Sequence, residues 1–239
     1  ELDPATKTLM PRLAESWEIG EDNLTITFRL RDGARFASGN PVTAADVKYS
    51  FDRLMRLGQA QSSGLSSRGF SADGVDAQFV VVDDQTFQMV MPEAGDPKMI
   101  LMYIAQAGVG SILDSALVMA NAGDDDGQGW LTNNSAGSGA FTLGQWRSNE
   151  YVILTRNDAF WGEAAQMSRV LMRHLPESQS QRLALVAGDL DVGFGLSAPD
   201  LRALETAAGI TVSTVPSAGF YYLAAPAADE KFANPKVRE

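Results

Sequence analysis

The sequence contains no cysteine and only one histidine, His174. The lack of cysteine excludes disulfides, thiolate nucleophiles and thiolate metal sites. A single histidine leaves a Ser-His-Asp arrangement arithmetically possible. His174, however, lies within a strand-like segment, residues 170–175, and no nucleophile-elbow motif is present. We interpret His174 as a structural or solvent-facing residue, and we predict no catalytic residue, no metal ligand and no cofactor.

Basic residues are also scarce. The 239-residue chain has 19 Lys and Arg against 30 Asp and Glu, which gives a formal net charge of −11. Because binding to nucleic acid needs an excess of cations that neutralise phosphates, nucleic acid is not an expected partner. Anionic lipid surfaces are unfavourable for the same reason. A hydrophobic content of 45% is enough for a buried core in one large or two modest domains.

Long apolar runs are missing too. No run approaches the roughly 20 residues that span a bilayer, and the longest, residues 99–105, has the size of a buried core segment. The chain begins at Glu1 without a methionine and has no basic-then-apolar export signal. We expect either that a signal peptide has been removed or that the sequence is an excised piece. The absence of cysteine is compatible with an envelope protein.

The first half of the chain predicts strands and helices in alternation. Residues 24–30 alternate apolar and polar side chains, as a half-buried strand does. A helix is predicted to begin at Ala44 with Thr43 as its N-cap, and Gly58 can end it. Residues 59–78 are rich in Ser, Gly and Gln and are interpreted as an exposed loop. The other predictions for this half are a hairpin over 80–91, a helix over 98–107 and a polar surface excursion over 121–135.

The second half also mixes strands and helices. A strand is predicted over 170–175, followed by a helix over 178–187 and a short strand over 191–194. A further helix is predicted to be capped by Ser197 and stopped at Gly209. Strands over 210–215 and 220–224 complete the predictions. The fold class is therefore α/β with mixed α+β character rather than a helical bundle.

An acidic run at residues 124–127, Asp-Asp-Asp-Gly, invites comparison with a calcium loop. An EF-hand loop would have Glu where Ser135 stands, and it needs a helix on each side, so the match fails. We interpret the run as a solvated acidic loop. Other carboxylates can in principle pair as acid and base, although no spacing singles out a pair. These carboxylates are Glu15, Asp46, Glu163, Glu177 and Asp191.

A glycine-rich segment carries the most specific pattern. Residues 136–141 read Ala-Gly-Ser-Gly-Ala-Phe and are followed by Trp146, by Arg-Asn at 156–157 and by Phe-Trp at 160–161. Two glycines that flank a serine allow backbone conformations that a side chain forbids, and the alternation beyond them predicts a strand. Neither Walker nor dinucleotide-binding spacing is present. The glycines therefore indicate a conformational role rather than a phosphate site.

This spacing resembles the Gly-Thr/Ser-Gly-Pro-Tyr/Phe, Trp, Arg-Asn, Tyr-Trp-Gly signature of bacterial solute-binding proteins of the peptide/nickel-binding family, the receptors of ABC importers. Two departures affect local geometry: Ala140 replaces the usual proline, and Ala-Ser at 37–38 replaces the common His-Asp. Four more segments resemble family blocks in the correct order: residues 13–18, 28–50, 183–191 and 232–239.

The resemblance implies the fold and the domain organisation. It implies a type II periplasmic-binding-protein lobe with a mixed sheet and flanking helices, and a second lobe that is largely missing. Residues 1–239 are then the first lobe. Within it, about 24–135 form an inserted helix and hairpin part, 136–225 form the sheet part, and 226–239 begin the crossover to the second lobe.

The resemblance also implies a function. The chain is expected to act as the substrate-binding component of an ABC importer, a periplasmic monomer rather than an enzyme. Its partners would be the membrane permease and a small solute, with peptide favoured over oligosaccharide. Two alternatives stay open: a secreted hydrolase that uses acidic residues, and a truncated lobe without independent binding. The residues implied as ligand-binding are Gln106, Gly108, Gly137, Ser138, Phe194, Tyr221 and Tyr222.

Overall fold

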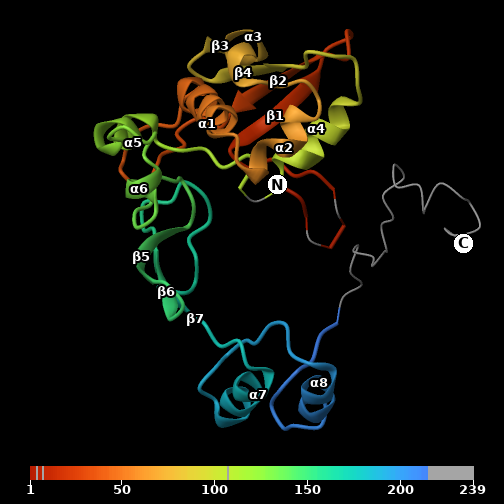
Figure 1. Cartoon of the computed structure of the whole chain (residues 1–239), viewed down its shortest axis with the longest axis vertical. Coiled ribbons are helices and arrows are strands. Elements are labelled where there is room, and N and C mark those ends of the chain that lie inside the picture. Colours follow the sequence, from red (N-terminus) through yellow and green to blue (C-terminus); the bar gives the residue numbers. More distant parts are fainter. Residues whose placement is uncertain (4, 7, 107, 215–239) are drawn as a thin grey trace, which may run out of the picture. The chain divides into compact units, whose positions relative to one another are not determined.

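The computed structural model describes residues 1–3, 5–6, 8–106 and 108–214 (Figure 1). The chain divides into two compact units, Glu1–His174 and Leu175–Glu239, and each is considered by itself. None of the helices in the described ranges is long and apolar enough to cross a membrane. The first unit combines helices with two separate antiparallel sheets, and the described part of the second unit contains two helices. This architecture agrees with the predicted α/β class.

The first sheet has four strands in the order β1-β2-β4-β3. Its strands are β1 (Ala14–Ile19), β2 (Thr25–Leu30), β3 (Phe79–Asp83) and β4 (Thr86–Val90). The predicted strand face is confirmed, because Ile26, Phe28 and Leu30 of β2 are all buried. The predicted hairpin over 80–91 is confirmed by the antiparallel pairing of β3 with β4.

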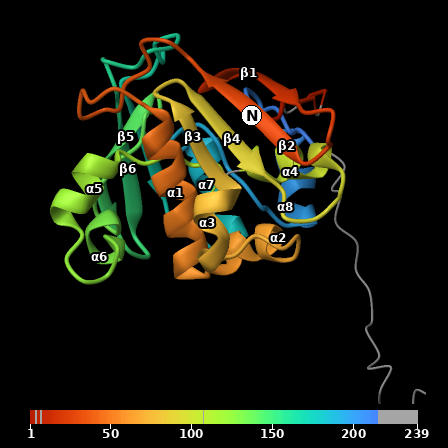
Figure 2. The same ribbon diagram turned by 90° about the horizontal axis from the view of Figure 1, so that it is seen from above.

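Helix α1 (Ala44–Leu57) covers this sheet and packs on β3 and β4 (Figure 2). Its Phe51 ring stacks on two strand residues, with centroids 5.2 Å from Phe79 and 5.9 Å from Phe87. The predicted helix start and end are also confirmed. Thr43 is the N-cap and forms a capping box with Asp46, and Gly58 ends the helix in the left-handed conformation that glycine tolerates.

The exposed loop predicted over 59–78 is wrong. This segment forms four short helical turns, and two of its side chains, Leu65 and Phe70, are buried in the same core as the sheet. The Phe70 ring stacks on Phe79 at 5.5 Å. Two isolated apolar residues among Ser, Gly and Gln show no periodicity, so the sequence gives no signal of their burial. The turns are η1 (Ala60–Ser62), α2 (Ser63–Ser66), η2 (Ala72–Gly74) and α3 (Val75–Gln78).

The rest of the first unit leads into a second sheet. Helices α4 (Pro97–Ile104), α5 (Ser115–Asn121) and α6 (Gln128–Leu131) come first. A three-stranded antiparallel sheet then follows in the order β5-β6-β7. The predicted helix over 98–107, the strand predicted directly after the glycine-rich segment and the strand predicted over 170–175 are confirmed within a few residues. The strands are β5 (Phe141–Arg147), β6 (Tyr151–Arg156) and β7 (Arg169–Arg173).

The second unit contains helices α7 (Ser178–Ala187) and α8 (Ala198–Leu204). Both predicted helices exist, although α8 ends before Gly209. The strand predicted over 191–194 is wrong, because these residues pair with no strand in the described part of the chain and the Phe194 amide donates instead to the Gln181 side chain, at 3.2 Å. Residues 210–214 are likewise not a strand. The strand predicted over 220–224 lies outside the described residues.

Substitution of Thr43 tests the N-terminus of α1. Thr43→Ala removes the hydroxyl that donates to Oδ2 of Asp46 at 2.8 Å, and loss of one such hydrogen bond of the capping box costs about 1 kcal/mol of unfolding free energy. Thr43→Ser keeps the hydroxyl and should retain most of that stability. Urea denaturation monitored by circular dichroism measures both variants. Equal stability of the wild type and Thr43→Ala would contradict the capping assignment.

The carboxylate of Asp200 in α8 accepts a hydrogen bond from Ser178 in α7, so the stability of the second unit should depend on pH. The pKa of Asp200 is lowered, mainly by the hydrogen bond from the Ser178 hydroxyl and then by that from Ser197. A lowered folded-state pKa means that the stabilisation is present above the unfolded pKa and is lost as the pH falls through the folded pKa. Ser178→Ala should therefore raise the pKa of Asp200. Carboxyl carbon NMR titration measures it, and an unchanged pKa in the variant would refute this cause.

Candidate functional site

The glycine-rich segment forms an anchored turn at residues 136–140, here called the 136–140 turn. Each of its five carbonyl oxygens accepts a hydrogen bond from another part of the first unit, so the backbone is fixed at every peptide. The donors, in order from residue 136 to residue 140, are Asp114 N (2.8 Å), Ala37 N (3.1 Å), Trp161 Nε1 (3.0 Å), Asn157 Nδ2 (3.0 Å) and Asn157 N (2.9 Å).

Two signature residues supply three of these donors. Asn157 is buried and donates both its side-chain amide and its backbone amide to the turn. Its remaining side-chain oxygen accepts from the Ala159 amide at 3.1 Å, so the side chain is fixed on both sides. Trp161 donates its indole N–H to the Ser138 carbonyl. The Arg-Asn and Phe-Trp spacing seen in the sequence therefore has a structural explanation, because these residues hold the glycine-rich turn.

A buried carboxylate, Asp114, anchors the turn from the opposite end. Only 1% of this residue is exposed, and its Oδ2 accepts from Ser38 Oγ at 2.5 Å and from Asn40 Nδ2 at 2.9 Å. Its Oδ1 accepts from the Leu117 amide at 3.0 Å and so caps α5. Sequence reasoning missed Asp114 entirely. An Asp before a helical pattern is an N-cap signal, but nothing local indicates a partner in the loop at 37–40.

A second buried carboxylate, Asp46, fixes the segment next to Asp114. Its Oδ2 accepts from the amide and hydroxyl of Thr43, and its Oδ1 accepts from the amide and hydroxyl of Ser115. The adjacent Leu113 amide donates to the Ser50 hydroxyl at 2.9 Å. The amides of Leu113 and Ser115 therefore hold the entry to α5 on α1, while the Asp114 amide between them bonds to the 136–140 turn. Asp46 serves this attachment and is not half of an acid–base pair of carboxylates.

The N–H and O–H groups of the turn, unlike its carbonyl oxygens, are largely without hydrogen-bond partners in the described part of the chain. The backbone amides of Gly137, Ser138 and Gly139 donate to no group among the described residues, and the Ser138 hydroxyl has no partner there either. Gly137 and Ser138 are half-buried and Gly139 is exposed. The five carbonyl oxygens of the turn are therefore bonded to the protein, whereas three of its amides and one hydroxyl have no partner among the described residues.

The other predicted ligand residues are not gathered around the turn. Gln106 and Gly108 lie together in an exposed loop after α4, where the Gln106 carbonyl accepts from the Val109 amide at 3.3 Å. Phe194 belongs to the second unit and is 82% exposed. Tyr221 and Tyr222 lie outside the described residues. Of the predicted set, the described residues bring only Gly137 and Ser138 into one structural element.

Enclosed space lies elsewhere in the first unit. An apolar cavity of about 170 Å³ lies among β1, β2, α1 and α4, with Trp17, Phe28, Phe51 and Leu101 in its wall. A hollow of about 250 Å³ is lined by residues near Arg68 and Glu93. Neither is lined by any of the predicted ligand residues. None of residues 136–140 lines either of these two spaces.

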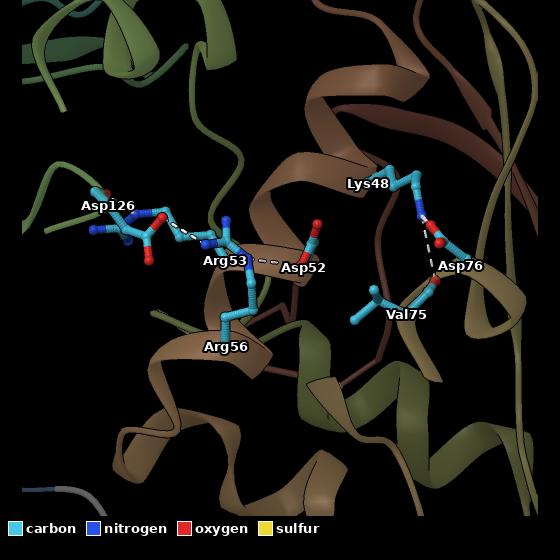
Figure 3. A network of polar contacts seen from close by, with 7 residues as sticks. All are labelled: Lys48, Asp52, Arg53, Arg56, Val75, Asp76 and Asp126. Atoms are coloured by element: carbon cyan, nitrogen blue, oxygen red, sulfur yellow. Dashed lines mark hydrogen bonds and ion pairs between the residues drawn. The ribbon is translucent and has the colours of Figure 1, made fainter. Parts of the chain in front are cut away.

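The acidic run at 124–127 is only partly the solvated loop that the sequence suggests. Asp126 Oδ1 pairs with Arg56 Nη1 at 2.5 Å, and the Asp126 carbonyl accepts from Arg53 Nε at 2.6 Å (Figure 3). The pair with Asp126 is the main cause of the raised pKa of Arg56. Asp125 accepts from two backbone amides of its own loop. Within the described ranges, no group of three or more His, Asp or Glu residues is placed to hold a metal ion.

His174 lies at the end of the first unit, directly after β7. It is exposed, and its backbone amide donates to the Glu150 carbonyl at 2.8 Å. No hydrogen bond connects its ring to a serine or a carboxylate in the described part of the chain. This position agrees with a solvent-facing residue.

Replacement of Asp114 tests its role as an anchor. Asp114→Asn keeps an acceptor for the Leu117 amide but places an NH₂ group against the Asn40 amide, itself a donor. The variant should lose about 1–3 kcal/mol of unfolding free energy, the cost of unsatisfied buried polar groups. Asp96, the exposed N-cap of α4, provides the matched control, since Asn caps as well as Asp and Asp96→Asn should be nearly neutral. If Asp114→Asn and Asp96→Asn change the unfolding free energy equally in urea denaturation, the assignment of Asp114 as an anchor is wrong.

Two curated proteins are similar to most of this chain. The probable D,D-dipeptide-binding periplasmic protein DdpA of Escherichia coli (strain K12) is 34% identical over 211 residues, which cover 88% of this chain and 39% of that protein. The dipeptide-binding protein DppE of Bacillus subtilis (strain 168) is 22% identical, with coverage of 96% and 42%. The chain therefore spans about two fifths of the length of these relatives.

Solved structures show the same fold. The periplasmic binding protein DppA from Helicobacter pylori, in complex with the peptide STSA, superposes with a TM-score of 0.69 at 24% identity, and covers 86% of this chain and 41% of its own. NikZ from Campylobacter jejuni, in complex with Ni(L-His), gives a TM-score of 0.68 at 18% identity, with coverage of 86% and 38%. The predicted fold is thus confirmed, and it corresponds to about two fifths of each of these solved binding proteins.

The family assignment rests on most of the chain. The family described as "Bacterial extracellular solute-binding proteins, family 5 Middle" matches residues 8–239. This range includes all five segments on which the resemblance was identified. The chain belongs to the family 5 bacterial extracellular solute-binding proteins.

Proposed function

We propose that this chain is part of the receptor of an ABC importer, which captures a solute in the periplasm and delivers it to the membrane permease. The family is one of solute-binding receptors and not of enzymes. Relatives are named for the binding of dipeptides, and one structural neighbour holds a tetrapeptide-length ligand, STSA. These names favour a peptide-like solute over an oligosaccharide.

One feature of this chain supports the proposal. Every carbonyl of the 136–140 turn is bonded to the protein, while the Ser138 hydroxyl on the same turn has no partner among the described residues. A binding group is effective when its scaffold is already in place, because little ordering cost remains to be met on binding. Ser138 meets this condition. We assign Gly137 and Ser138 as ligand contacts of the receptor.

The remaining contacts come from the family resemblance. We propose Gln106, Gly108, Phe194, Tyr221 and Tyr222 as further parts of the binding surface. Residues 1–239 would form the first lobe, with about 24–135 as its inserted part, 136–225 as its sheet part and 226–239 as the start of the crossover. Receptors of this kind close two lobes on the solute about a hinge. The intact receptor would act as a monomer.

The rival from another class is a hydrolase that uses acidic residues. Such an enzyme needs two carboxylates directed at one bond, or one carboxylate with a raised pKa. Asp46 and Asp114, the two buried acids of the described chain, are instead bonded to backbone and hydroxyl or amide donors. Both are therefore fully used in structural bonds. Incubation of the protein with dipeptide and glycoside substrates should give no hydrolysis, and hydrolysis by the purified wild type would favour the enzyme.

Calorimetry on the intact receptor tests the ligand contact. With the dipeptide alanyl-alanine as probe, Ser138→Ala should weaken binding by about 2–10-fold, since one hydrogen bond is worth roughly 0.5–1.5 kcal/mol. Ser148 is an exposed residue between β5 and β6, so Ser148→Ala is the matched control and should leave the affinity unchanged. Binding that is equally strong in all three proteins would remove Ser138 from the site. Lack of binding by the wild type would count against a peptide receptor.

A further inference from the structure

The second sheet of the first unit has one face that is rich in arginine, here called the arginine face. Residues that lie opposite each other on β5, β6 and β7 share a face, and successive residues along a strand alternate between the two faces. The register therefore places three rows of side chains on the arginine face. These rows are Arg147–Tyr151–Arg173, Gln145–Ile153–Leu171 and Thr142–Thr155–Arg169.

The arginine face carries three cations and no acidic residue of its own. Glu150, in the turn between β5 and β6, pairs with Arg147 at 3.8 Å, and Cζ of Arg147 lies 5.8 Å from the centre of the Tyr151 ring. Arg169 and Arg173 are exposed, and neither has a carboxylate partner in the described part of the chain. Because acidic residues outnumber basic ones by 30 to 19 in the whole chain, this face is a local reversal of charge.

The centre of the arginine face is apolar. Leu171 is 51% exposed, and Ile153 beside it is half-buried. An apolar centre bordered by arginine and tyrosine, without Lys, Asp or Glu, has the composition of the contact region of a protein–protein interface. Nine side chains are fewer than the roughly 20–30 residues that a stable interface uses on each side. The face therefore suits a transient contact.

The opposite face of the same sheet is the better surface for packing within the receptor. Both of its central rows are apolar throughout, Leu143–Leu154–Val170 and Trp146–Val152–Met172. Burial of these rows gains hydrophobic free energy, whereas burial of arginines without partners has a desolvation cost. A further part of the receptor thus gains more by covering the apolar face, and the arginine face remains for a separate partner.

Charge complementarity calls for an anionic partner, either a membrane or an acidic protein. Sites that bind anionic lipids usually contain about four to eight basic residues. Three arginines on a chain with a net charge of −11 fall short of that number. An acidic protein surface can instead pair with single arginines and also cover Ile153 and Leu171, so it fits the whole face better.

Resting on the proposed receptor function, we infer that the arginine face docks on an acidic surface of the importer's membrane permease. Exposed ion pairs act mainly on the rate of association, and each adds little to the affinity. A contact of this kind forms quickly and also dissociates quickly. A receptor that delivers one solute after another requires both properties.

Uptake of radiolabelled alanyl-alanine tests the inference in cells whose only dipeptide receptor is the intact form of this protein. Joint substitution Arg147→Gln, Arg169→Gln and Arg173→Gln should lower uptake about tenfold, since each exposed ion pair contributes roughly twofold to threefold. Calorimetry should show unchanged affinity for alanyl-alanine. The corresponding Lys variant keeps the charge and should retain most of the uptake. Arg202→Gln, at an exposed arginine of α8, is the matched control and should have no effect.

The other outcomes separate this inference from the receptor function. Normal uptake by the triple Gln variant would overturn the inference and leave the receptor function standing. A lower urea midpoint of that variant would show that the receptor itself covers the face, and the inference would again be wrong. Co-sedimentation of the wild type, but not of the variant, with phosphatidylglycerol vesicles would assign the face to the membrane instead. If the wild type supports no uptake, the importer function fails, and this inference fails with it.

Discussion

The buried carboxylate of Asp114 is the interaction on which the candidate site depends. It accepts hydrogen bonds from Ser38 and Asn40 and caps α5, while its own amide bonds to the Ala136 carbonyl. One residue thereby joins the loop after β2, the start of α5 and the first peptide of the 136–140 turn. A buried charge is tolerable only when it is well paired, and this one has three donors. The turn is consequently held to a core that α1 and the first sheet build independently.

Asn157 and Trp161 hold the far end of the turn as Asp114 holds the near end, so every carbonyl in it accepts a hydrogen bond from the protein. The Ser138 hydroxyl has no partner among the described residues and stands on this fixed backbone. Such a hydroxyl can donate to or accept from a polar group of a solute. This contact requires no further ordering of the backbone. It requires no catalytic group, which agrees with a family whose members capture solutes rather than transform them.

Much of the fold was predictable because its signals are local. The alternation in β2, the capping box at Thr43 and Asp46, and the glycine that ends α1 all act within a few residues. The signature around 136–161 predicted that the turn matters but not how it is held, since Asp114 and Ser38 are 76 positions apart. Burial of Leu65 and Phe70 was missed for a similar reason, because two apolar residues in a polar segment form no pattern. The false strand at 191–194 had the right composition, but no strand among the described residues pairs with it.

A crystal structure of the intact receptor with bound alanyl-alanine would test the central claim most directly. The account predicts a polar atom of the dipeptide about 2.7–3.2 Å from the Ser138 hydroxyl oxygen, with all five carbonyls of the turn still bonded to the protein. A dipeptide bound elsewhere, with this hydroxyl facing water, would contradict it.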